Sequence, residues 1–182
     1  MILYHAGFEI IRRPDVHFGR KNADFGQGFY LTADAEFARR WARARRGQKT
    51  VINTYSLDCA GLQIHRFRRN ADWFSYLYAN RNRQPDALAA DVVIGPVAND
   101  TIYDTWGIIT SGFLKPEVAM ELLLIGPEYR QIALKTEKAA AQLQWLSCQE
   151  LSSEKIAGYR DLVAKEEDAY QSLFVKALEQ LV

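Results

Sequence analysis

Three side chains lie in predicted strands or at their ends and are suited to hold a sugar and an aromatic ring. His5 closes the first strand, Tyr30 lies in the second, and Gln131 opens a late one. A strand-end histidine offers one donor and one acceptor, which suits a ribose hydroxyl. A tyrosine ring stacks on a planar heterocycle. The segments that carry these side chains are residues 3–7, 24–32 and 129–134.

Two glycines lead into the strand that holds Tyr30. Gly26 and Gly28 let the backbone approach a ligand closely, because glycine has no Cβ. The phosphate-binding pattern Gly-x-Gly-x-x-Gly is absent, since a third glycine is missing and a strand rather than a helix is predicted to follow. The pair therefore does not predict a Rossmann-type nucleotide loop.

Other chemistries find little support in the sequence. His17 and His65 have no Cys, Asp or Glu at metal-ligand spacing, so we expect surface histidines and no metal. Ser111 lacks the Gly-x-Ser-x-Gly turn of serine hydrolases. Asn99 and Asp100 follow an apolar strand, where they act either as functional polar groups or as turn caps.

The pattern around these residues predicts an α+β domain. Asp34 is a plausible N-cap for a helix over residues 35–46, closed by Gly47. Further helices are predicted over residues 70–84 and 116–124 and from Thr136 to about residue 143, and strands over 2–4, 29–32, 51–57, 91–97 and 131–135.

Length and composition bound the organisation. With 182 residues, 48% of them hydrophobic, the chain suits one domain, assigned to residues 1–148. Residues 152–182 form a helical extension with an amphipathic face that includes Ile156, Tyr159, Leu162 and Val163. No apolar stretch reaches the roughly 20 residues of a membrane span, and the first residues suggest a strand rather than a signal peptide. Cys59 and Cys148 lack ligand spacing, which favours a reduced cytoplasmic location.

Charge is divided unevenly along the chain. Residues 1–90 hold 15 Lys/Arg against 8 Asp/Glu, whereas residues 91–182 hold 8 against 14. The densest basic run is residues 39–46, where Arg39, Arg43 and Arg46 would share a helix face. Such a face binds phosphates, or is an ordinary solvated surface.

The three segments, in this order, resemble the His-Tyr-Glu class of ADP-ribosyltransferases, which includes the poly(ADP-ribose) polymerases and diphtheria toxin. Residues 1–148 further resemble an uncharacterised bacterial family of this superfamily, whose members share residues 91–100 and often sit beside a small antitoxin-like gene. The resemblance implies a split β-sheet core with flanking helices, and NAD as substrate.

The same resemblance assigns roles at the site. His5 would hold the adenosine ribose, the backbone of Ala6 and Gly7 the nicotinamide amide, and Tyr30 the nicotinamide ring. Apart from the resemblance, Arg20 and Lys21 lie just before the Tyr30 segment, and their charge suits them to meet the pyrophosphate as charge-assisted donors. The remaining positions assigned to cofactor binding are Gly28 and Thr32.

Gln131 takes the place of the family's glutamate, which stabilises positive charge on the reacting ribose. Glutamine hydrogen bonds but carries no charge, and losing one oriented charge costs on the order of 100-fold in rate. The resemblance implies transfer of ADP-ribose to a protein or nucleic-acid acceptor, by the toxin of a toxin–antitoxin pair, and Gln131 favours a single transfer over chain elongation. The alternative is a weak or inactive NAD- or ADP-ribose-binding module with the same fold. A nucleic-acid-binding protein ranks third, because the basic run explains neither the His5 nor the Tyr30 segment.

Overall fold

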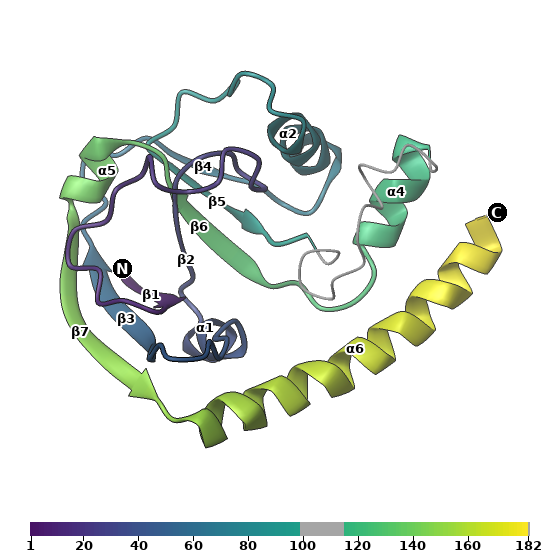
Figure 1. The fold of residues 1–182 in the computed structure, drawn as a ribbon. Helices are drawn as coiled ribbons and strands as arrows, with labels where there is room; N and C mark the ends of the chain where they lie inside the picture. The colour runs from purple at the N-terminus through teal and green to yellow at the C-terminus, as the bar shows by residue number, and fades with distance from the viewer. Residues whose placement is uncertain (99–114, 182) are drawn as a thin grey trace.

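The computed structural model describes residues 1–98 and 115–181 (Figure 1). Its two sheets, flanking helices and long C-terminal helix confirm the α+β prediction. The strands are β1 (Ile2–Gly7), β2 (Phe29–Leu31), β3 (Thr50–Leu57), β4 (Ile64–Arg66), β5 (Val92–Pro96), β6 (Arg130–Leu134) and β7 (Leu143–Leu151). The helices are α1 (Ala35–Arg40), α2 (Ala71–Arg81), α4 (Pro116–Leu123), α5 (Glu137–Ala141) and α6 (Ser153–Leu181).

The first sheet is antiparallel, with strand order β1-β3-β7. His5 lies opposite Asn53, which lies opposite Cys148 on β7. The second sheet has the order β2-β6-β5-β4 and is antiparallel except for the β4–β5 pair. Two backbone hydrogen bonds between Tyr4 and Thr32 join the sheets where β1 meets β2. This junction sets the predicted histidine and tyrosine segments side by side.

The second sheet separates two apolar clusters because its side chains alternate in direction. Phe29 and Leu31 point into a cluster with Leu3 and Tyr55 of the first sheet. Tyr30, between them, packs on the opposite cluster. That cluster gathers around helix α2 and holds the buried residues Phe25, Trp73, Leu77, Val93 and Ala133.

Helix α6 crosses below α1 and extends toward α4 (Figure 1). Ile156 packs in a small cluster with Ala38 and Leu151, and Tyr170 is buried. Leu162, predicted on the apolar face, is 47% exposed, so that part of the prediction was wrong. An ion pair of Glu166 with Arg40 fastens the middle of α6 to α1.

The basic helix predicted over residues 35–46 is shorter than expected. Asp34 caps it as predicted, but it ends at Arg40. Gly47, at φ +76°, sits instead in a tight turn bridged by Arg45 and Gln48. The face predicted for Arg39, Arg43 and Arg46 therefore does not form, because the last two lie beyond the helix.

Two strands were not predicted. Strand β4 is only three residues long, and β7 has exposed or half-exposed side chains along most of its length, so neither carries a strong apolar pattern. Asn99, Asp100 and Ser111 lie outside the described residues, as does the end of the 91–100 stretch.

Candidate functional site

The ring of His5 is held in one orientation by β2. Its Nδ1 lies 2.7 Å from the carbonyl oxygen of Tyr30, and its ring centroid lies 4.6 Å from that of Phe29. Burial lowers the pKa of His5 below its usual value and outweighs the carbonyl contact, which raises it. The imidazole is therefore neutral at pH 7.

The contact with Tyr30 also determines the tautomer of His5. A backbone carbonyl only accepts, so Nδ1 carries the proton and donates it. In a neutral ring Nε2 is then an unprotonated acceptor. None of the described residues donates to this nitrogen.

Gly7 leaves space beside that acceptor. Residues 5 and 7 point to the same side of β1, and a Cβ added at Gly7 would lie 3.3 Å from His5 Nε2. A hydroxyl hydrogen-bonded to Nε2 would need this space. Ala6 points to the other side of β1, against the cluster of α1 and α6, so only its backbone can serve the site.

The hydroxyl of Tyr30 is fully used within the protein. It donates to the carbonyl of Gly26 at 2.7 Å and accepts from the N–H of Phe25 at 3.0 Å. Burial and the negative charge of Asp24 raise its pKa well above the usual range, and Arg20 opposes this. A ligand can therefore contact only the ring of Tyr30. The positive charge of Arg20, which is exposed, lies close enough to Tyr30 to affect its pKa.

Gly26, Gly28 and Thr32 have structural roles. A Cβ at Gly28 would lie 2.7 Å from the carbonyl of Leu134, and Gly26 has φ +71°. The hydroxyl of Thr32 donates a hydrogen bond to the carbonyl of Arg130 at 3.0 Å and thereby links the end of β2 to β6. These residues shape the Tyr30 segment through internal contacts.

Gln131 belongs to a buried polar network that the sequence did not predict. Its Nε2 donates to Asp24 Oδ2 at 3.1 Å, and the two residues are 8% and 7% exposed. The other Asp24 oxygen receives Arg81 Nη2 at 2.7 Å and Nε at 2.9 Å. The backbone N–H of Ala98 approaches Oδ2 at 3.3 Å.

The glutamates nearest to Gln131 along the chain, Glu128, Glu137 and Glu121, lie elsewhere in the structure. Glu137 is exposed on α5, 3.5 Å from His17 Nε2. Glu128 contacts Arg130 at 3.3 Å, and Glu121 is exposed on α4. The carboxylate that contacts Gln131 is that of Asp24.

The structure brings the predicted residues together in two groups. Tyr30 lies opposite Ala133, so Tyr30 and Gln131 are diagonal neighbours on one face of the sheet, roughly 7–8 Å apart by usual strand spacing. The His5 ring lies on the other face of β2, against Phe29. The site therefore has two parts, joined through the backbone of Tyr30.

Two buried polar residues support these parts and were missed. In the sequence, Asp24 is only the first residue of the Tyr30 segment, and nothing beside it indicates a separate role. Asn53, fully buried, accepts from Ile11 N–H and Trp145 Nε1 at 3.2 Å and donates to the Glu9 carbonyl at 2.9 Å. It fixes the loop after β1. Asn53 shares its face of the strand with Val51, Tyr55 and Leu57, and a polar residue on this apolar face was the available signal.

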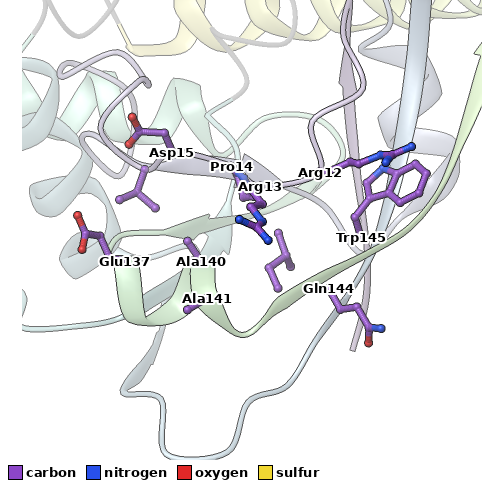
Figure 2. Close-up of a pocket in the computed structure, with 11 residues that line it drawn as sticks. Arg12, Arg13, Pro14, Asp15, Glu137, Ala140, Ala141, Gln144 and Trp145 are labelled. Carbon is purple, nitrogen blue, oxygen red and sulfur yellow. The ribbon is translucent and has the colours of Figure 1, made fainter.

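A cavity of about 710 Å³ lies apart from both groups. The loop after β1 and the α5–β7 turn form it, with Arg12, Arg13 and Trp145 among its walls (Figure 2). The Arg12 guanidinium lies 5.0 Å from the Trp145 ring centre. None of the predicted site residues lines it.

Comparison with known families places the chain in one of them. Residues 1–145 match the family described as "Protein of unknown function (DUF3990)", and the chain belongs to this family. No curated protein matches the chain. The match covers β1 to β6 and therefore both groups of site residues.

Residues 1–98 and 115–181 contain no candidate metal site and no candidate membrane span. No group of three or more His, Cys, Asp or Glu side chains there is arranged to hold a metal ion. In the same part of the chain, no helix has the length and apolar character needed to cross a membrane. Cys59 and Cys148 are free thiols.

Proposed function

We propose that this protein binds NAD and transfers its ADP-ribose to a protein or nucleic-acid acceptor. The observation that carries the proposal is the His5 ring. It is neutral, its Nδ1 donates to Tyr30, and its Nε2 acceptor faces the space left by Gly7. A ribose hydroxyl that donates a hydrogen bond needs an acceptor with open space beside it, as His5 Nε2 provides.

The second part of the site suits the nicotinamide half of the same ligand. Tyr30 offers a ring whose hydroxyl is already bonded, and Gln131 lies diagonally across on the same face. Arg20 brings positive charge near Tyr30, where it can meet a pyrophosphate. Because NAD has two riboses joined by a pyrophosphate, two separated recognition sites suit it.

The proposed reaction breaks the bond between the ribose C1′ and the nicotinamide nitrogen. The bonding electrons leave with nicotinamide, and positive charge develops on the ribose. A nucleophile of the acceptor then forms a bond to C1′ and releases its proton to solvent. Gln131 would accept a hydrogen bond from the ribose and orient it, and a neutral amide favours a single transfer over chain elongation.

The binding module is the second candidate, because a specific observation favours it. Gln131 carries no charge, and the carboxylate beside it, Asp24, is already paired with Arg81. Such a site can hold NAD or ADP-ribose without efficient turnover. The toxin role and the antitoxin partner belong to the proposal as well and rest on the family resemblance. Action in the cytoplasm is also part of the proposal and rests on the two cysteines, Cys59 and Cys148, which are free thiols.

Labelled NAD tests the two candidates together. Purified protein is incubated with it, with and without cell lysate, and both nicotinamide release and label retained on macromolecules are measured. The transferase predicts lysate-dependent label that Gln131→Ala and Tyr30→Ala abolish. Saturable binding lost in Tyr30→Ala, without turnover, supports the binding module instead. Release without retained label identifies a glycohydrolase, and neither binding nor release overturns the proposal.

A further inference from the structure

The amide of Gln131 meets a carboxylate that determines which way it faces. Asp24 Oδ2 accepts from Gln131 Nε2 at 3.1 Å, in a network with both residues buried. The reverse orientation would set the amide oxygen against a carboxylate oxygen, where neither can donate. The oxygen of Gln131 is therefore directed away from Asp24.

Asp24 is itself rigidly held. Its Oδ1 receives two bonds from Arg81 of α2, and its Oδ2 receives the N–H of Ala98 after β5. A carboxylate that accepts from four donors has little freedom to rotate. Its orientation is transmitted to the Gln131 amide.

We propose that Asp24 is a positioning residue that fixes the Gln131 amide so that its oxygen faces the reacting ribose. This inference rests on the proposed function. A carbonyl oxygen accepts from a ribose hydroxyl and stabilises positive charge on the ribose, whereas an N–H presented there opposes that charge. By fixing this orientation, Asp24 allows the neutral Gln131 side chain to bind the ribose hydroxyl and to stabilise positive charge on the ribose.

The same geometry explains why glutamine stands where the related transferases have glutamate. A carboxylate at position 131 would meet Asp24 Oδ2 at about hydrogen-bond distance, and like charges that close force one group to take up a proton. Among the described residues, the charged or titratable groups around the introduced carboxyl are Asp24, Arg81 and Tyr30. Lys135, directly after β6, already pairs with Asp86 at 3.0 Å.

An exchange of the two side chains tests this inference. In Asp24→Asn, Arg81 retains the amide oxygen, the new NH₂ faces Gln131, and the Gln131 amide turns over. We expect about a 100-fold loss of kcat for nicotinamide release, with the Kd for NAD within threefold of wild type. Gln131→Glu alone loses activity as well, because its carboxyl shares a proton with Asp24. The double variant Asp24→Asn/Gln131→Glu restores an amide–carboxylate pair and recovers at least tenfold over either single variant.

Urea unfolding between pH 5 and 8 provides a readout that needs no turnover. Gln131→Glu is expected to lose stability relative to wild type as pH rises, because deprotonation places two charges together, and adding Asp24→Asn removes this slope. Asp91→Asn is the matched control. Asp91 is a buried aspartate directly before β5 of the same sheet, and it is bonded to Gln63 N–H, Thr136 and Lys138. Its variant therefore loses stability but keeps kcat within threefold.

The outcomes separate this inference from the proposed function. Unchanged kcat in Asp24→Asn, no recovery in the double variant, or no pH-dependent coupling in the unfolding experiment each overturns the role of Asp24. Absence of nicotinamide release from the wild-type protein overturns the transferase, and the catalytic role of Asp24 with it. In that case the unfolding experiment still decides whether Asp24 fixes the Gln131 amide.

Discussion

Gly7→Ala separates ligand binding from folding at the His5 acceptor. The added Cβ would lie 3.3 Å from Nε2, and the ring cannot turn away easily because Nδ1 is bonded to Tyr30 and the ring packs on Phe29. A hydroxyl needs to approach Nε2 to about 2.8–3.0 Å, through the space that the methyl fills. Loss of one neutral hydrogen bond costs about 0.5–1.5 kcal/mol, so the Kd for NAD should rise roughly twofold to twelvefold.

The fold should tolerate this change. Alanine in an extended strand gains about 0.5–1 kcal/mol over glycine through lower backbone entropy, which offsets the tight contact with His5. Isothermal titration with NAD and urea unfolding of the same samples measure both quantities. Gly158→Ala, in an open position on α6, is the control and should leave the Kd unchanged. If Gly7→Ala binds NAD as tightly as the wild type does, Nε2 is not the ribose contact.

Three further predictions concern the supports of the site. Tyr30→Phe keeps the ring but leaves the Phe25 N–H and the Gly26 carbonyl without their hydrogen-bond partner. Urea unfolding should therefore show a loss of stability of about 1–3 kcal/mol, and an unchanged midpoint would contradict the assigned bonds. Because the pKa of His5 is lowered in the folded protein, the unfolded chain takes up a proton at His5 at a higher pH than the folded chain does. The stability that neutral His5 contributes is therefore complete above its ordinary pKa near 6.5 and is lost as pH falls below that value. His5→Gln should flatten that part of the unfolding curve against pH, and an identical curve would refute the assignment. Glu166→Gln weakens the contact of α6 with Arg40 and Tyr129, so limited proteolysis should cut within α6 faster than in wild type, and equal rates would show that the helix is held elsewhere.

Much of the fold could be predicted because local signals agree with the packing. Asp34 and Thr136 cap helices as expected, and the apolar run before Val97 is a buried strand. The length of α1 could not be predicted, since a basic stretch with good helix formers also suits the turn that Thr50 secures by donating to the Arg43 carbonyl. Tertiary contacts decide such cases.

The site could be predicted only in part, for a related reason. His5 and Tyr30 could be predicted because their segments are recognisable sequence motifs. The backbone contact between them follows from the junction of the two sheets. The Asp24–Gln131 contact joins residues 107 positions apart in the chain, and it involves Arg81 on a helix between them. Nothing in the local sequence of any of the three indicates such a pairing.

The measurement that tests the central claim most directly is nitrogen NMR of His5 at pH 7, with and without NAD. Both the transferase and the binding module require Nε2 to accept from the ligand. We predict that free protein shows the proton on Nδ1 and an unprotonated Nε2, and that saturating NAD shifts the Nε2 resonance as a hydrogen bond forms. A proton on Nε2 in the free protein, or an Nε2 resonance that saturating NAD leaves unchanged, would contradict the account.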